Sequence, residues 1–409
     1  MNKQVQSVNL SDEEMVIDFS QYSLNQFAFD SEKSVLLKYY SFSEKERRRP
    51  PVLLEDPVED TEIFSTQQSK DPRSGYPEGW SLERYNQSST EEAFVVRFKE
   101  MFVGPGGMVL DPKTNKSYYH GPLAAHHGPW VNNRSYKVRK IDSVFPLLVP
   151  WGWSWQHFIP ELLDQLVFAK DILIERPDVK ILIDGPPQFD SFWTICRDVL
   201  GLRNDYVHFS RRVGDPDWDE ILHADEIIYC HFAPIKKGFD MVPKMIKWVR
   251  AEFISTDRPM HERDKVIYIS RAAGPKSGKR QIENQTDVIN AMTALVNQHE
   301  PRWEVVEFSP PDYNLFETMD LFSKARAVVC LIGGANANLL FAPPQTVVIE
   351  CIPAMFPLIN FFGISGAVGH KYWSLPISGA STDDQIIKLP LDKIIRTLKK
   401  SLCQLNGLW

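Results

Sequence analysis

The stretch that decides the fold comprises residues 328–351 and reads VVCLIGGANANLLFAPPQTVVIEC. It contains two continuous apolar runs, at 328–332 and 346–351, which are typical of parallel strands covered on both faces. Between them the sequence predicts a glycine turn at Gly333 and Gly334, a short helix and a Pro-Pro break. Such a βαβ unit belongs to an open α/β sheet, which binds ligands beyond the carboxyl ends of its strands. The glycine turn is therefore a candidate binding site.

A helix that begins at this turn would suit an anion. Its first backbone N–H groups have no partner within the helix, and the helix dipole places positive charge there. A diphosphate would fit such a position. The alternative is that Gly333 and Gly334 only allow helix and strand to pack closely, because Gly-Gly after a strand is a weak motif on its own.

The rest of the second half repeats this alternation. We expect strands at 265–270 and 303–308, helices at 285–298 and 315–325, and a closing helix at 391–402. Strands that alternate with helices predict a parallel sheet.

The first half alternates in the same way. We expect strands at 180–184, 206–209 and 226–230, a helix at 189–200, and a long amphipathic helix at 239–253. The chain therefore reads as an α/β protein, and its 409 residues suffice for two domains with separate cores. We place an irregular N-terminal extension at 1–75 and domains at 76–258 and 259–409.

A basic loop follows the predicted strand at 265–270. It reads SRAAGPKSGKRQIEN over residues 270–284 and carries Arg271, Lys279 and Arg280. Because the carboxyl ends of parallel strands meet at one edge, these cations would face the same crevice as the glycine turn. Each charge-assisted contact to a diphosphate is worth about 1.5–3 kcal/mol. The alternative is a solvated loop with incidental charges.

A helix of the first half carries a His/Glu pair. His157 and Glu161 stand four residues apart in an apolar helical pattern, so they share one face near its beginning. Such a pair can serve as a general base and the group that orients it. The alternative is a structural hydrogen bond.

Bulk composition excludes several classes. A formal net charge of −7 argues against a general binder of nucleic acid or anionic membranes. No metal site is expected, because the histidines at 120, 126 and 127 lack acidic or cysteine partners at ligand spacing. Five cysteines, mostly inside apolar runs, are expected as core side chains.

The sequence also predicts a soluble protein. It has no run of about 18 apolar residues that could span a membrane, and its first residues lack the apolar core of a signal peptide. We therefore expect a cytoplasmic protein without an integral membrane segment, with the secretory pathway as the less favoured alternative.

Three blocks, taken together, resemble the glycosyltransferase 61 family, which includes plant and fungal β-xylosyltransferases and animal O-linked N-acetylglucosaminyltransferases. WQHFIPELL resembles the family block YHWLLExLP, with His157 and Glu161 on its histidine and acid. SRAAGPKSGKRQIEN is similar to SRxxSRRIxNE, with Arg271, Arg280 and Asn284 matching.

The third block is the stretch at 328–351. It resembles VVGPHGAGLTNLLFLPPGAVVIEI, and the matching residues include Gly333, Asn338 and Glu350. The order and spacing of the three blocks make the resemblance specific.

The resemblance implies a GT-B fold, in which two Rossmann-like domains face a cleft, with the acceptor mainly on 76–258 and the donor mainly on 259–409. It implies an inverting, metal-independent glycosyltransferase without a cofactor. Its donor would be a UDP-sugar, with xylose or N-acetylglucosamine favoured, and its acceptor a glycan or glycoprotein hydroxyl. No Asp-x-Asp stands at a strand end of the second domain, in agreement with the absence of a metal.

The same resemblance implies roles for the matched residues. Glu161 or His157 would deprotonate the acceptor, and cations would neutralise the leaving diphosphate. The predicted donor site comprises Arg271, Lys279, Arg280, Asn284, Gly333, Gly334, Asn338 and Glu350, of which Glu350 would accept from a ribose or sugar hydroxyl.

Two positions depart from the family pattern. Ile332 stands where the family has a histidine, and Gln285 stands where it has an acid. These changes keep open a non-catalytic homologue that binds a nucleotide-sugar or a glycan. A Rossmann oxidoreductase or epimerase is disfavoured, because neither domain opens with a strand followed by Gly-x-Gly-x-x-Gly.

Overall fold

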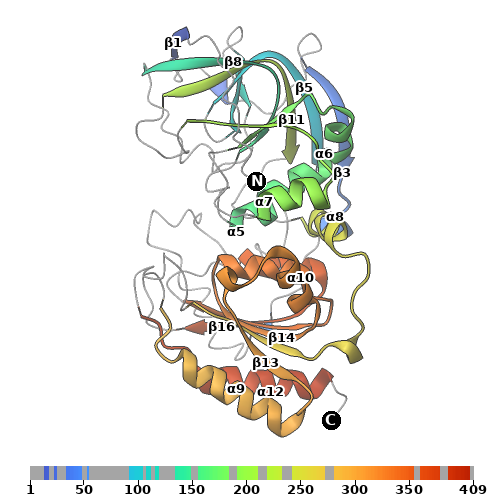
Figure 1. The fold of residues 1–409 in the computed structure, drawn as a ribbon, viewed down its shortest axis with the longest axis vertical. Helices are drawn as coiled ribbons and strands as arrows, with labels where there is room; N and C mark the ends of the chain where they lie inside the picture. Colours follow the sequence, from blue (N-terminus) through green and yellow to red (C-terminus); the bar gives the residue numbers. More distant parts are fainter. Residues whose placement is uncertain are drawn as a thin grey trace. The chain divides into compact units, whose positions relative to one another are not determined.

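A computed structural model gives the fold (Figure 1). It describes residues 13–17, 23–24, 34–47, 53–54, 92–104, 107–111, 116–118, 134–148, 155–183, 191–210, 219–232, 242–271, 281–353, 360–377 and 386–405. The chain divides into two compact units. The first comprises Met1–Phe42 and Thr90–Lys236, and the second Ser43–Ser89 and Lys237–Trp409.

The second unit is built on a six-stranded sheet whose strands all run parallel. The strands are β12 (Lys265–Ile269), β13 (Glu304–Phe308), β14 (Ala325–Leu331), β15 (Val347–Pro353), β16 (Lys371–Ile377) and β4 (Leu53–Leu54), in the order β13-β12-β14-β15-β16-β4. Without β4 this is the doubly wound order 2-1-3-4-5, whose direction of winding reverses between β12 and β14. Ligands of such sheets bind beyond the carboxyl ends of these two strands.

Helices cover both faces of this sheet (Figure 1). On one face α9 (Gln285–His299) packs against β13, and α12 (Leu391–Leu405) packs against α9 and β15. On the other face lie α8 (Pro243–Phe253), α10 (Leu315–Ser323), the 3-10 helix η8 (Gly334–Phe341) and α11 (Asn360–Val368).

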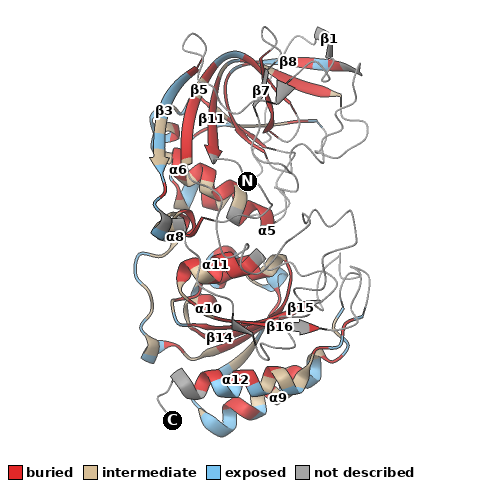
Figure 2. Ribbon diagram, turned by 180° about the vertical axis from the view of Figure 1, so that it is seen from behind, coloured by how far each residue is buried: buried red, intermediate tan, exposed pale blue. Residues whose placement is uncertain are grey.

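Burial follows from this double cover. Every residue of β14 is buried, as the continuous apolar run predicts (Figure 2). In contrast, α9 and α12 each keep exposed positions on the side away from the sheet (Figure 2). The strands and helices expected for the second half are confirmed.

The first unit contains a mixed ten-stranded sheet. Its parallel part consists of β8 (Arg134–Leu147), β9 (Lys180–Ile183), β10 (Tyr206–His208) and β11 (Glu220–Phe232), in the order β10-β9-β8-β11. In chain order this is 3-2-1-4, so the winding reverses between β8 and β11. Helix α6 (Leu163–Glu175) stands between β8 and β9 in the chain and packs on β11.

The other part of this sheet is antiparallel. Strand β5 (Glu92–Val103) pairs antiparallel with β11, with β3 (Ser34–Ser41) and with β6 (Val109–Asp111). Further strands are β1 (Glu13–Ile17), β2 (Ser23–Leu24) and β7 (Lys116–Tyr118). The neighbours β5, β6 and β7 are joined by short connections, which antiparallel strands allow and parallel strands do not. The α/β class is compatible with both sheets, and the facing GT-B arrangement and the domain limits stay predictions.

Candidate functional site

Arg271 and Gly333 meet where the second sheet reverses its winding. Arg271 follows the carboxyl end of β12, and Gly333 follows that of β14. A Cβ at position 333 would overlap the guanidinium of Arg271. Because φ of Gly333 is 173°, its backbone is extended, so glycine is needed for space and not for conformation.

The contacts of Arg271 fix it against the glycine turn. Its Nη2 donates to the carbonyl oxygen of Ile332. Its backbone N–H lies 3.3 Å from Oε1 of Gln285, whose Nε2 donates to Ser270 Oγ at 3.0 Å and to Glu307 at 2.9 Å. The amide of Gln285 can donate and accept at once, which a carboxylate cannot do. This residue therefore ties the start of α9 to the ends of β12 and β13.

Glu350 accepts a hydrogen bond at each of its carboxyl oxygens, one of them from Asn336, which follows the glycine turn. Its side chain is fully buried, and Asn336 Nδ2 donates to its Oε1 at 2.8 Å. The hydroxyl of Tyr372 donates to its Oε2. Burial raises the pKa of Glu350 to about 7, although both hydrogen bonds and the charge of Arg271 act in the opposite direction. Its predicted contact with a sugar hydroxyl stays a prediction, and here both carboxyl oxygens are engaged from within the protein.

The other predicted donor residues have different surroundings. Asn284 is buried and binds the backbone of Leu389 on both sides of its amide, at 2.9 and 2.8 Å. Asn338 is buried in η8, and Gly334 is the first residue of that helix. Lys279 and Arg280 lie outside the described residues, as do the histidines at 120, 126 and 127.

His157 and Glu161 interact in the first unit as their spacing predicts. Nδ1 of His157 lies 2.8 Å from Oε1 of Glu161, and the side chains are 5% and 12% exposed. Helix α5 (Trp155–His157) passes into a π-helical turn (Phe158–Leu162) before α6 begins. π-helical turns are rare in proteins overall, but those that occur are often found at functional sites. This irregularity therefore supports a site here. Since these residues follow β8, they belong to the carboxyl side of the strand at which this sheet reverses its winding.

A second acid, Asp164, follows the pair. Burial, with a smaller contribution from the charge of Glu161, raises the pKa of Asp164 well above its ordinary range. Its Oδ1 is buried and has no hydrogen-bond partner among the described residues. The segment from α5 into α6 thus holds a hydrogen-bonded His/Glu pair and, three residues later, an acid whose burial favours the neutral form.

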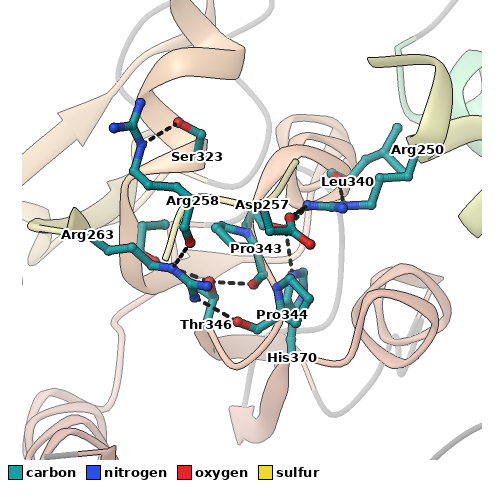
Figure 3. Close-up of polar contacts among 12 residues, drawn as sticks. Arg250, Asp257, Arg258, Arg263, Ser323, Leu340, Pro343, Pro344, Thr346 and His370 are labelled. Atoms are coloured by element: carbon teal, nitrogen blue, oxygen red, sulfur yellow. Dashed lines mark hydrogen bonds and ion pairs between the residues drawn. The ribbon is translucent and has the colours of Figure 1, made fainter. Parts of the chain in front are cut away.

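An arginine cluster that sequence reasoning missed holds the other end of η8 (Figure 3). Arg250 of α8 donates to the carbonyl oxygens of Leu340 and Ala342 at 3.0 and 3.2 Å and forms an ion pair with Asp257. Arg263 donates to the carbonyl oxygen of Pro344 at 2.7 Å. These carbonyl oxygens belong to the end of η8 and to the Pro-Pro break that follows it. They need outside donors, because proline ends the helical hydrogen bonding there.

His370 completes this cluster. Its Nε2 lies 3.2 Å from the carbonyl oxygen of Ala342 and its Nδ1 lies 3.2 Å from Ser365 Oγ. This arrangement fits the neutral imidazole, with Nε2 as donor and Nδ1 as acceptor. Burial lowers the pKa of His370 to about 4. The only signals for this cluster in the sequence are scattered basic residues, which have no local pattern.

Two general searches concern only the described part of the chain. Within it, no three His, Cys, Asp or Glu side chains gather as metal ligands do. None of the helices described combines the length and hydrophobicity that crossing a membrane requires.

A comparison with family models agrees with the motif blocks. The family model described as Glycosyltransferase 61 matches residues 155–349, from the first residue of α5 to the residue before Glu350. The chain matches no curated protein.

Similar solved structures include a histidine-to-aspartate mutant of a flavo di-iron protein from Thermotoga maritima. It has 11% identity and a TM-score of 0.25, over 76% of this chain and 96% of its own. A metal-soaked flavodiiron core from Synechocystis sp. has 11% identity and a TM-score of 0.23, over 77% of this chain and 64% of its own. Likeness at these TM-scores carries no argument about fold or function.

Proposed function

We infer that this chain is a glycosyltransferase of the 61 family, because residues 155–349 match the family model. We propose that it transfers a sugar from a UDP-sugar with inversion and without a metal. Xylose and N-acetylglucosamine are the favoured sugars, and the acceptor is a hydroxyl of a glycan or glycoprotein. These details are implied by the motif blocks.

The observation that carries the donor site is the contact between Arg271 and the glycine turn. A guanidinium at the carboxyl ends of β12 and β14 stands where doubly wound sheets bind phosphates. Arginine offers up to five donors in a planar fork, which matches the oxygens of a diphosphate. In our proposal Arg271, with Lys279 and Arg280, stabilises the charge that develops on the leaving UDP.

The acceptor side is assigned to the His157–Glu161 pair. Inversion in a single step needs a base that takes the proton of the attacking hydroxyl. The 2.8 Å contact lets one member accept that proton while the other orients it. We assign the base to Glu161, because its carboxyl is the more exposed of the two side chains.

The proposal is tested with Arg271→Ala and Arg280→Ala. Release of UDP from UDP-xylose and UDP-N-acetylglucosamine is measured with the wild type and both variants. Removal of one donor to a developing charge typically lowers kcat by about 10²–10³-fold. Arg302→Ala is the matched control, because Arg302 is 83% exposed and carries the same charge in the same unit. Full turnover in both test variants would reject the donor site.

A second candidate function is a homologue that binds a nucleotide-sugar without transferring it. It is favoured by Ile332, which takes the place of the family histidine and whose carbonyl oxygen accepts from Arg271. Calorimetry that shows UDP binding, together with no hydrolysis and no transfer to any acceptor, would favour this alternative.

A further inference from the structure

We propose that Glu350 and Asn336 are positioning residues for the donor, which fix the glycine turn beside Arg271 and do not touch the donor themselves. This inference rests on the proposed function, because it gives the diphosphate site its support.

Asn336 connects the carboxyl group to both sides of the turn. Its backbone N–H donates to the carbonyl oxygen of Gly333 at 2.9 Å. Its side-chain Nδ2 lies 2.8 Å from Glu350 Oε1 and 3.3 Å from the carbonyl oxygen of Leu331. Because Asn336 and Glu350 are both 0% exposed, a ligand in solvent does not reach either side chain. Their effect on a donor must pass through the turn that they hold.

The network also has hydrogen-bonding capacity that it does not use. Asn336 Oδ1 and Ser374 Oγ are buried and have no hydrogen-bond partner among the described residues. Ser374 is the register partner of Glu350 on the adjacent strand. Burying a carboxyl group and two unpaired polar atoms costs free energy of folding, and apolar side chains at the same positions would avoid this cost. Such a cost, next to a candidate anion site, is expected of a functional network.

The titratable groups around Glu350 come from several elements. They are Arg271 after β12, Cys330 on β14, Cys351 on β15 and Tyr372 on β16, whereas η8 carries no titratable side chain. Burial raises the pKa of both thiols, which keeps them neutral near pH 7. With a pKa of about 7, Glu350 changes charge within reach of Arg271.

The charge of Glu350 is therefore coupled to the donor through Arg271. Ionised Glu350 attracts the guanidinium and repels a diphosphate placed beyond it. A bound diphosphate offsets the charge of Arg271 and so removes one cause that lowers the pKa of Glu350. Donor binding then draws a proton onto Glu350, and donor affinity falls as pH rises through neutrality.

The test measures UDP-sugar affinity by calorimetry between about pH 6 and pH 8.5. UDP-xylose and UDP-N-acetylglucosamine serve as probes, because their diphosphates are diesters and keep their charge over this range. Wild-type affinity should fall about three- to tenfold, since one unit of pKa shift corresponds to a tenfold change. Glu350→Gln should bind with an affinity that does not change with pH, because its amide mimics the protonated acid.

Tyr372→Phe keeps the test valid if Glu350→Gln does not fold. The loss of this hydroxyl removes a hydrogen bond that lowers the pKa of Glu350, so the affinity change should move to higher pH. The inference is overturned if Glu350→Gln keeps the wild-type pH profile, or if a folded Tyr372→Phe leaves that profile unmoved. If the wild type binds neither probe, the proposed function fails first and the inference fails with it.

Discussion

The guanidinium of Arg271 occupies the space that a side chain at Gly333 would need. These residues stand 62 positions apart and come from the ends of β12 and β14. An anion site at this place needs the positive charge of Arg271, and the guanidinium fits there only because residue 333 has no side chain.

The first prediction concerns Gly333→Ala. The new methyl group collides with the far end of a flexible side chain, so Arg271 moves and the fold survives. We expect UDP release to fall about 10²-fold, with a loss of at most about 1 kcal/mol in the free energy of unfolding.

A double-mutant cycle checks the cause. In an Arg271→Ala background the added methyl group no longer collides, so Gly333→Ala should produce no further loss of activity. Independent, additive losses would show that the glycine acts for another reason.

The second prediction concerns the His157–Glu161 pair. Glu161→Gln removes the proposed base but keeps the shape and a hydrogen-bond partner for His157. We expect kcat for transfer to fall about 10²–10⁴-fold, while calorimetry shows unchanged affinity for the UDP-sugar. Glu175→Gln, at the far end of α6, is the control. Equal donor affinity with unchanged kcat would remove Glu161 from the mechanism.

The sequence predicts the second unit well because each of its elements has a local cause. The continuous apolar run of β14 requires cover on both faces, and the Pro-Pro break ends η8 after eight residues. The meeting of Arg271 with the glycine turn follows from parallel strands that end at one edge.

Other features depend on partners that are distant in the chain. Asn284 matches a family motif, yet its amide binds Leu389, 105 residues away. The antiparallel pairing of β5 with β11 and the arginine contacts at Ala342 and Pro344 are equally non-local. No spacing rule identifies such pairs, because tertiary packing selects them.

The third prediction concerns stability against pH. Burial raises the pKa of folded Glu350 from 4.5 to about 7, so its neutral form favours the fold and its contribution is lost as pH rises from 4.5 to 7. Burial lowers the pKa of folded His370 from 6.5 to about 4, so its contribution is lost as pH falls from 6.5 to 4. Each is worth about 3 kcal/mol, and in the wild type the two slopes oppose each other.

Single variants should separate these slopes. Glu350→Gln leaves the His370 slope, so its free energy of unfolding should rise between about pH 4 and 6.5. His370→Gln keeps a donor for Ala342 and should show the opposite trend. Urea unfolding across this range measures both, and parallel profiles for the two variants would contradict the assignment.

The last prediction concerns the arginine cluster at the end of η8. Arg263 is buried and donates to the carbonyl oxygens of Arg258 and Pro344 at 2.8 and 2.7 Å. Arg263→Met keeps the apolar stem but leaves both oxygens unpaired, which should cost about 2–4 kcal/mol. The neighbouring Arg258 is 32% exposed, and its ion pairs with Glu262 and Asp320 are 3.6 and 3.5 Å long. Arg258→Met should therefore cost less than about 1 kcal/mol. Urea unfolding compares the free energies of unfolding of the two variants. Equal losses would show that burial of the Arg263 guanidinium adds nothing to its stabilising effect at this break.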